Sequence, residues 1–444
     1  MKLSKLGRIA LATAASLFIG FGTQSCYYYT EAYIIVTGSQ YNQVASYREQ
    51  NQTGVLSAAP GNPLSSGGNN PIRALLLNGG RYVYVLNEGT PTYNADGSIK
   101  WTGATISLFS IGGDGGLSSQ FTVPSQGRGS IRLALATSGS YLYVLDQYQP
   151  GGSDPNTTPS STSVSAATPC YDSAHGVYHP AGDITVFSID PSTGRLFLVQ
   201  NQQQQNSLGT PLTYFPIGCG AIDFHLASSY LYTAEALDPA SGNSQVVYAY
   251  NASSNGQLIQ VPGGAQPITG ATNIGVIGTS SSGSYIYILD NGTNSIFTFT
   301  QGGNGLLSAI SGGSAANAPN AAGMTALTTD SNSKYLYITD TQATSLGASG
   351  SVIAGYDITG SSGDLTPFNL NPANSTATFP TGSTPVCIFE DPSHQYIYTA
   401  NAGSSNITGS KIDPNTGTLT NLSKGSSFTT VGTPTWCLYS SNTD

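Results

Sequence analysis

The sequence predicts an all-β protein: a seven-bladed β-propeller of four-stranded antiparallel blades. The main observation is a strand motif that recurs seven times, six of them as Tyr-x-Tyr, with copies that begin at Tyr33, Tyr82, Tyr141, Tyr230, Tyr285, Tyr335 and Tyr396. Each copy is apolar on both faces, and such a strand must be covered on both sides. No sustained helical period follows residue 26. Doubly covered strands without helices indicate a radial array of small sheets.

Each repeat has the same predicted order of strands. An apolar first strand is followed by a Ser/Gly turn, the Tyr-type second strand, a third strand, a tight turn and a fourth strand. Turns such as Asp190-Pro191-Ser192-Thr193-Gly194 suit the last connection, because Pro fixes φ early in a turn and Gly accepts a positive φ at its end. The first strands are predicted over Ile72–Leu77, Ile131–Ala136, Ala221–Leu226, Asn273–Thr279, Met324–Thr329, Pro385–Glu390 and Pro434–Tyr439.

The two ends of the mature chain are expected to meet in one blade. The chain opens on a second strand at Tyr33 and closes on a first strand at Pro434 to Tyr439. The last strand should therefore complete the first blade and remove the open edge that a linear array would leave. Residues 27–444 then form a single domain.

Residues 1–26 have the pattern of a bacterial secretion signal. Lys2, Lys5 and Arg8 form a basic start, and the apolar core from Ile9 to Phe21 is short for a membrane span. Thr23-Gln24-Ser25-Cys26 is similar to a lipoprotein processing site with lipid attached to Cys26; ordinary cleavage near this point is the alternative. The sequence therefore predicts an exported protein of the bacterial cell envelope, lipid-anchored or otherwise secreted.

The composition restricts the partners. Charged residues make up 8% of the chain and the formal net charge is -9, which excludes nucleic acid and anionic membrane surfaces as partners. Contact with a membrane is expected only through the lipid anchor. We find no nucleophile elbow, phosphate loop or dinucleotide fingerprint, so we predict no cofactor, and we expect a monomer.

Four cysteines remain beyond Cys26, and in an exported protein they predict two disulfides. Cys170 and Cys219 lie on connections that should emerge on one face of the third blade, so we pair them. Cys387 and Cys437 lie on first strands that are neighbours across the closure, so we pair these as well, although inner strands can be too far apart for a bridge.

Two insertions break the repeat, at residues 147–183 and 200–218. The first is rich in Pro, Ser and Thr, and the second contains Gln202-Gln203-Gln204-Gln205. Both connections should emerge on the same face of a propeller. Long loops on a rigid scaffold often carry binding sites, and variable decoration is the alternative.

With these repeats, the chain resembles the lactonase-type propellers, the 6-phosphogluconolactonase-like family, and the related YVTN-repeat surface propellers. The resemblance covers roughly residues 31–440 and rests on Gly80-Arg81-Tyr82-Val83-Tyr84-Val85-Leu86-Asn87-Glu88, the Asp-Pro-x-Thr-Gly turns and Glu390-Asp391-Pro392-Ser393. It implies the seven-bladed fold. The family's catalytic His and Arg positions fall here on Gly129, Ile131 and Gly218-Cys219-Gly220-Ala221, and its second Asn-Glu pair is Glu235-Ala236.

Polar residues on the first strands are candidates for a site in the central channel. Arg73 and Arg132 both lie nine residues before a Tyr motif, and Asp223 and His225 share one face of the next first strand. They could form an anion or sugar site, with His225 as a base oriented by Asp223. A solvated channel with incidental ion pairs is the alternative, and the one that we favour.

A second candidate is a ring of polar residues, one in each of six repeats, five positions after the first Tyr: Asn87, Asp146, Glu235, Asp290, Asp340 and Asn401. On the insertion-bearing face this ring could bind a cation or a polyol. Repeated Asp and Asn at strand ends also cap turns with their side chains, which is the interpretation that we favour.

His175 and His179 are four residues apart, close to Cys170 and Asp172, and have the chemistry of metal ligands. Gly176 and Pro180 oppose the helix that would align the two histidines, so we predict a disulfide-stapled loop and no metal.

Two functions fit the sequence. The first is an exported binding module that contacts a carbohydrate or a protein through its loop-bearing face, supported by the missing family Arg and His, the low charge and the 27 Tyr. The second is a lactonase whose catalytic groups have moved to Arg73, Arg132, Asp223, His225 and Glu235. We favour the binding module, because it needs only loops that are present.

Overall fold

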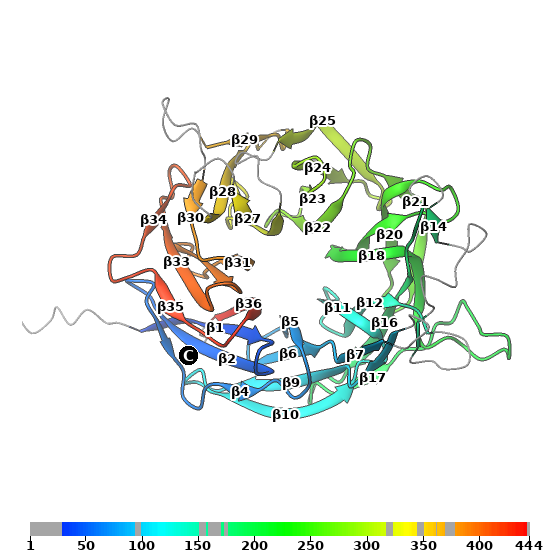
Figure 1. Cartoon of the computed structure of the whole chain (residues 1–444), viewed down its shortest axis with the longest axis horizontal. Helices are drawn as coiled ribbons and strands as arrows, with labels where there is room; N and C mark the ends of the chain where they lie inside the picture. Colours follow the sequence, from blue (N-terminus) through cyan, green and yellow to red (C-terminus); the bar gives the residue numbers. More distant parts are fainter. Residues whose placement is uncertain are drawn as a thin grey trace, which may run out of the picture.

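The computed structural model has the all-β propeller arrangement that the sequence predicts (Figure 1). It describes residues 29–93, 99–150, 157–158, 170–172, 176–316, 323–343, 350–360, 362–368 and 378–441. These residues contain no helix, and hence none long and apolar enough to cross a membrane. The predicted leader with Cys26 lies outside the described residues.

Antiparallel sheets surround a central axis, and the first strand of each repeat is innermost (Figure 1). The sheet that holds both chain ends has the order β3 (Leu56–Ala58), β2 (Gln43–Gln50), β1 (Thr30–Gly38) and β36 (Pro434–Ser441), with β4 (Leu64–Ser65) paired to β2. The next sheet is β10 (Leu117–Pro124), β9 (Thr105–Ile111), β6 (Tyr82–Asn87) and β5 (Pro71–Leu76).

Two repeats are joined into one sheet on the insertion-bearing side, because β16 pairs with β18. This sheet consists of β11 (Arg128–Leu135), β12 (Tyr141–Tyr148), β16 (Ala181–Ile189), β17 (Leu196–Leu198), β18 (Phe215–Ala227), β19 (Tyr230–Leu237), β20 (Ser244–Ala252) and β21 (Leu258–Pro267).

Three further sheets complete the ring. They are β22 (Ile274–Thr279), β23 (Ile286–Asp290), β24 (Ser295–Gln301) and β25 (Leu307–Ala316); β26 (Met324–Thr329), β27 (Tyr335–Ala343), β28 (Gly350–Ile358), β29 (Leu365–Pro367) and β30 (Thr378–Pro380); and β31 (Pro385–Glu390), β32 (Tyr396–Asn401), β33 (Asn406–Ile412), β34 (Leu419–Asn421) and β35 (Ser427–Thr429).

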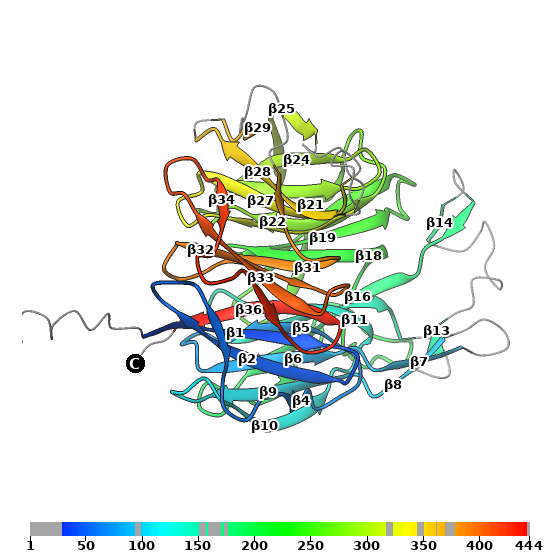
Figure 2. The same ribbon diagram turned by 60° about the vertical axis from the view of Figure 1, so that its left-hand side comes forward.

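Short strands extend outward from the ring (Figure 2). A small sheet is made of β7 (Thr90–Tyr93), β8 (Ile99–Thr102) and β13 (Thr157–Thr158), and a hairpin of β14 (Tyr171–Asp172) and β15 (Val177–Tyr178). β13, β14 and β15 belong to the 147–183 insertion, so this insertion forms structure beyond the repeat.

The chain closes as predicted. β36 pairs antiparallel with β1, with Ile34 opposite Tyr439 and Val36 opposite Cys437, so the last strand completes the sheet that begins the chain. Each of the seven predicted first strands overlaps an observed strand that pairs antiparallel with the expected Tyr-type strand. Such closure removes the unpaired edge of a linear array.

The hydrophobic core lies between neighbouring sheets. One cluster, for example, packs Tyr398 and Phe389 against Tyr47 and Val36 across the closure. The second tyrosine of each Tyr-x-Tyr motif is buried there, and in four repeats its hydroxyl donates to a turn carbonyl of the next repeat. Three of these bonds join Tyr232 to Gly305 at 2.8 Å, Tyr337 to Gly417 at 2.7 Å and Tyr398 to Gly54 at 2.7 Å. The hydroxyls of Tyr143 and Tyr287 have no partner among the described residues.

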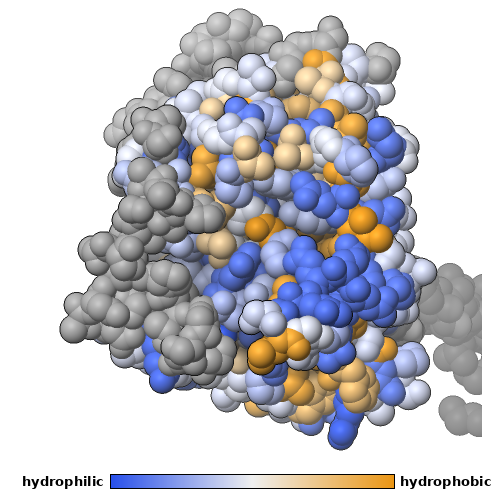
Figure 3. All heavy atoms as spheres, turned by 90° about the vertical axis from the view of Figure 1, so that its right-hand side faces the viewer, coloured by the Kyte–Doolittle hydropathy of each residue, from blue (hydrophilic) through white to orange (hydrophobic). Residues whose placement is uncertain are grey.

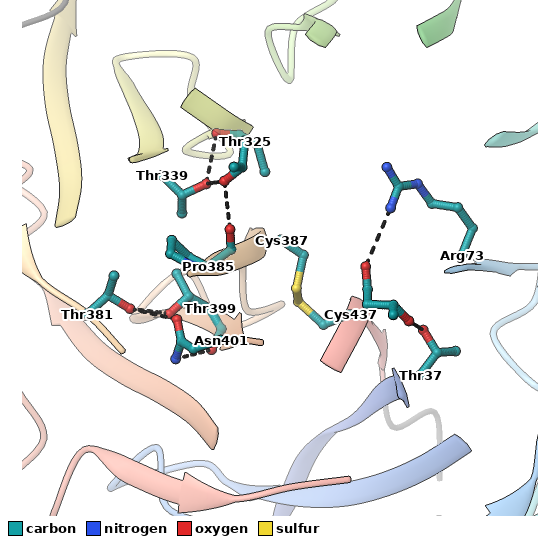
Figure 4. Close-up of a disulfide and its surroundings, with 12 residues drawn as sticks. Thr37, Arg73, Thr325, Thr339, Thr381, Pro385, Cys387, Thr399, Asn401 and Cys437 are labelled. Carbon is teal, nitrogen blue, oxygen red and sulfur yellow. Dashed lines mark hydrogen bonds between the residues drawn. A yellow bond between two sulfur atoms is a disulfide. The ribbon is translucent and has the colours of Figure 1, made fainter. Parts of the chain in front are cut away.

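Both predicted disulfides are present. Cys387 and Cys437 join inner strands β31 and β36 with a Cα–Cα distance of 5.8 Å, inside the range that a bridge requires (Figure 4). Cys170 and Cys219 join the 147–183 insertion to β18 at 5.4 Å. Neighbouring inner strands therefore do come close enough for a bridge at the closure.

Candidate functional site

A cavity of about 490 Å³ lies among the innermost strands, in the central channel. Four of the five predicted catalytic candidates line it: Arg73, Arg132, Asp223 and His225. The wall also contains Trp436, Thr279 and Thr328. All seven innermost strands, β5, β11, β18, β22, β26, β31 and β36, contribute residues to its wall, and the four candidates come from β5, β11 and β18.

Three of these residues lie at one level of the channel. Each stands opposite the fifth residue of its Tyr-type strand, directly after a β-bulge, in the pairs Arg73–Leu86, Arg132–Leu145 and Asp223–Ala234. Asp223 precedes its Tyr motif by seven residues, whereas each arginine precedes its motif by nine, so the sequence alone places Asp223 at a different level. The connection from β18 to β19 is shorter than the corresponding connections of the two arginine repeats. The strand pairing therefore places Asp223 at the same level as Arg73 and Arg132.

Asp223 is fully engaged by the protein. Its Oδ1 accepts from Arg132 Nε in an ion pair and from the Phe224 amide at 2.9 Å, and its Oδ2 accepts from the Ile277 amide at 3.1 Å. These three contacts come from β11, from β18 itself and from β22. Asp223 therefore fixes the Arg132 side chain and holds β18 against β22.

Arg73 has a different environment. Its guanidinium lies 4.0 Å from the centre of the Trp436 ring, and Nη1 donates to the Ile72 carbonyl at 3.0 Å, with the Thr435 carbonyl at 3.5 Å (Figure 4). No carboxylate among the described residues forms an ion pair with it. Burial, followed by the charge of Arg132, lowers the pKa of Arg73. The channel wall thus has one guanidinium without an anionic partner.

His225 is half-buried in the same wall, and its Nε2 lies 3.0 Å from Thr279 Oγ1. Burial lowers the pKa of His225 below its ordinary value, and Asp223 offsets part of this shift. The imidazole is therefore neutral at pH 7. When Nε2 donates to Thr279, the Nδ1 lone pair is left to accept a proton.

Glu235 does not join the other four candidates. It is fully buried, Thr233 donates to its Oε1 at 2.6 Å, and a Cβ at Gly218 would lie 2.0 Å from its Oε2. Burial raises the pKa of Glu235 to about 8. It lies on β19 opposite Ala221, between sheets, and the Cys170–Cys219 disulfide ties the insertion to the same strand pair.

The six residues of the predicted polar ring are all fully buried. Asp290 accepts from the amides of Thr272 and Thr293 at 3.2 and 2.9 Å, and Asn87 donates to the Ser66 carbonyl at 3.2 Å. Asp290 and Asn87 thus contact turns, whereas Asp146 accepts from Ser130 and Thr185 on neighbouring strands. With no exposed surface, these side chains offer a polyol or cation nothing to contact in this conformation.

The histidine pair of the insertion is only partly described. His179 packs beside Gly220, Cys170 is in a disulfide, and His175 lies outside the described residues. Trp436 and Thr279 were not among the sequence candidates. Both lie on predicted first strands, and tracing the channel-facing positions along all of those strands would have identified them.

The architecture is that of a β-propeller. No family model and no curated protein matches the sequence. Solved structures do match. The structure of a candidate 6-phosphogluconolactonase of Bacteroides fragilis is similar to this chain, with a TM-score of 0.63 and 16% sequence identity, and the match covers 92% of this chain and 98% of the Bacteroides chain. The periplasmic gluconolactonase of Pseudomonas aeruginosa matches with TM-score 0.64 and 14% identity over 92% and 99%. At these identities the likeness shows the fold alone.

Proposed function

We propose that the protein is a lactone hydrolase whose site is the channel cavity. This proposal rests on one observation: the neutral imidazole of His225 and the guanidinium of Arg73, which has no anionic partner among the described residues, line the same cavity of about 490 Å³. A six-carbon sugar-acid lactone suits a cavity of this size. This replaces the binding module that the sequence favoured, because the channel contains the groups that the hydrolase needs.

The chemistry follows from the two groups. His225 accepts a proton from water as the water oxygen bonds to the lactone carbonyl carbon. The negative charge that develops on the carbonyl oxygen is stabilised by Arg73. When the intermediate collapses, the ring C–O bond breaks and the imidazolium returns its proton to the departing oxygen. The product is a hydroxy acid, whose carboxylate stays near the arginines until release.

Arg132 and Asp223 act as positioning residues. Their ion pair bridges β11 and β18, and Asp223 also accepts from the Ile277 amide of β22. Three neighbouring inner strands are therefore held in register around the proposed site. Two of the matching solved structures bear lactonase names, which supports the reaction class through the shared fold.

The test is a lactone panel followed by titration of the released acid at pH 6.5, with gluconolactone and 6-phosphogluconolactone as the first substrates. We expect turnover above the uncatalysed rate, lowered by about 10²-fold or more in His225→Ala and in Arg73→Gln. Thr328→Val is the matched control, because Thr328 lines the same cavity and bonds only the neighbouring Thr329 carbonyl. An inactive wild type, or a His225→Ala variant as fast as wild type, contradicts the proposal.

We also propose that the protein is exported, with lipid on Cys26. Two disulfides support export, since such bonds persist in oxidising compartments, and one matching structure is of a periplasmic protein. Palmitate labelling of wild type and Cys26→Ala in a bacterial host tests the anchor. Labelling that is unchanged by the substitution rules out the lipid and leaves secretion.

A further inference from the structure

A second cavity, of about 760 Å³, lies away from the channel on the insertion-bearing side. We call it the outer cleft. Three stretches distant in the sequence form its walls: Trp101 to Thr105 at the end of β8, Pro124 to Arg128 between β10 and β11, and Asn206 with Thr210 to Tyr214 from the 200–218 insertion. Pro150, from the other insertion, completes it. Both insertions therefore contribute to one concave site.

The lining of the outer cleft combines flat apolar groups with uncharged polar ones. Trp101, Tyr214 and prolines supply apolar surface, while threonine hydroxyls and the amides of Gln126 and Asn206 supply donors and acceptors. The surface of this side is mostly hydrophilic, with separate hydrophobic spots (Figure 3). A pyranose has the same two characters: an apolar C–H face that packs on an aromatic ring, and hydroxyls around its edge.

The charges at the cleft are balanced within the protein. Arg128 lines the cleft but is only 4% exposed, and its charge acts on two carboxylates directly behind it, Asp146 and Asp183. At Gly127 a Cβ would lie 1.8 Å from Asp146 Oδ1, so one layer of backbone separates the cleft floor from the pair. Burial raises the pKa of both carboxyls, and the charge of Arg128 opposes this shift. Arg128 is the one charged side chain among the described lining residues and it is buried, so the cleft presents no exposed charge and suits a neutral ligand.

Trp101 has an unpaired donor in this wall. Its side chain is 8% exposed, its ring centre is 5.8 Å from that of Tyr148, and its indole N–H has no hydrogen-bond acceptor among the described residues. A buried donor without an acceptor costs stability, so it is usually retained where something else accepts from it. Here that observation is independent of the shape and the charge of the cleft.

We propose that the outer cleft binds a neutral saccharide, at a site separate from the channel. Tyr214 of the 200–218 insertion, which is partly exposed, provides the aromatic surface for stacking, and Trp101 lies in the opposite wall. The proposal stands apart from the lactone hydrolase, because the two cavities share no lining residue. The sequence prediction of a carbohydrate partner at the loop-bearing face is thereby given a location.

The chain offers an unusually direct test, because it has only two tryptophans and each lines one cavity. In Trp436→Phe, the fluorescence of Trp101 reports on the outer cleft alone; in Trp101→Phe, Trp436 reports on the channel. The probes are maltotriose, cellotriose and chitotriose, followed by an array of neutral glycans. We expect a saturable change of Trp101 fluorescence in Trp436→Phe with at least one neutral glycan, and no such change of Trp436 in Trp101→Phe.

A second variant protects the test against loss of fold. Thr213 is exposed in the cleft wall, so Thr213→Trp fills the cleft without disturbing a core, and Thr328→Val in the channel is the matched control. In calorimetric titrations we expect Thr213→Trp to weaken binding at least tenfold and Thr328→Val to leave it unchanged. Absence of any neutral-glycan binder, binding retained in Thr213→Trp, or a response from Trp436 in place of Trp101 overturns the proposal. None of these three outcomes depends on lactone turnover, so failure of the saccharide proposal can be distinguished from failure of the lactone hydrolase proposal.

Discussion

The closing seam, where β31 and β32 meet β36 and β1, and the insertion-bearing side, from β11 to β19, are built from the same repeat. Each contains one disulfide, and each buries acidic side chains. At the seam, the Tyr398 hydroxyl contacts Glu49 Oε1 at 2.8 Å and the Gly54 carbonyl at 2.7 Å. On the insertion-bearing side, the equivalent Tyr143 hydroxyl is buried and has no partner among the described residues.

The chemistry of Glu49 explains the seam. Burial, followed by the charge of Asp391, raises the pKa of Glu49 to about 9, so the carboxyl is protonated at neutral pH. Its O–H can then donate to Tyr398, which in turn donates to Gly54. The seam uses its polar groups to join two ends of the chain. On the insertion-bearing side, the Tyr143 hydroxyl makes no such bond to any described residue, so this tyrosine does not join neighbouring repeats through a hydrogen bond.

The largest expected effect is at the seam. Deleting residues 430–444 removes β36, all of its pairs with β1, and the Cys387–Cys437 bond. We expect the protein to lose its cooperative unfolding transition, because the loss reaches the roughly 5–15 kcal/mol that stabilises a whole domain. Urea denaturation followed by circular dichroism measures it, and deletion of 442–444, which keeps β36, is the control. A truncated protein that unfolds like the parent would show that the seam is dispensable.

The two disulfides compare the regions directly, since they close loops of nearly equal length, with separations of 49 and 50 residues. Chain entropy alone gives each about 4 kcal/mol. We expect Cys387→Ser/Cys437→Ser to lose nearly this amount and Cys170→Ser/Cys219→Ser to lose less. Among the described residues, the only other buried ones in the cluster around Cys170 are Cys219 and Leu237. Without the disulfide, the segment that contains Cys170 therefore becomes more mobile in the folded protein as well as in the unfolded chain, which makes the loss of stability smaller. Equal losses in denaturant titrations would remove this distinction.

The tyrosine hydroxyls give a smaller and sharper comparison. Tyr398→Phe leaves a buried carboxyl and a carbonyl without their partner, and we expect a loss of about 1–3 kcal/mol. Tyr143→Phe removes a hydroxyl that has no partner, so we expect a change within about 0.5 kcal/mol, or a gain. Both are read from urea midpoints at pH 7. A Tyr143→Phe variant as damaged as Tyr398→Phe would mean that the insertion-bearing side is held by the same bonds.

The dependence of stability on pH also separates the two regions. Glu49 and Asp146 have folded pKa values raised to about 9 and about 7 from 4.5 and 3.8, chiefly by burial. The folded protein therefore holds protons that the unfolded chain releases, and stability falls as pH rises from about 4 through these values. We expect Glu49→Gln to flatten the Tm profile up to pH 9, and Asp146→Asn to flatten it only below about pH 7. A wild-type Tm that rises across pH 5–9 would contradict both assignments.

The fold could be predicted from the local sequence pattern, because each Tyr motif is apolar on both faces. The chain begins on the second strand of a repeat and ends on a first strand, so the last strand was expected to complete the first sheet. The same register placed Cys387 and Cys437 on neighbouring inner strands, and both disulfide predictions are confirmed. The sequence also predicted four of the polar residues that line the channel: Arg73, Arg132, Asp223 and His225.

The sequence could not predict which residues of different strands lie at the same level of the channel, because this depends on the lengths of the connections between strands. The shorter turn after β18 moves Asp223 to the level of Arg73 and Arg132, and this is visible only in the pairing of strands. Glu235 lies against Gly218, at the end of the 200–218 insertion, and no repeat predicts that contact. The outer cleft joins Trp101 to Tyr214, and no repeat relates those positions.

The pairing of β36 with β1 also imposes an order on biosynthesis. The edge of β1 has no partner until Pro434–Ser441 is available, about four hundred residues after Tyr33. Intermediate sheets can form as they emerge, because their strands are close together in the chain, whereas the first sheet waits for the last. A chain stalled or cut near its end would therefore present an unsatisfied strand edge, which quality-control proteases and neighbouring chains can recognise. The closing strand thus completes both the first sheet and the ring.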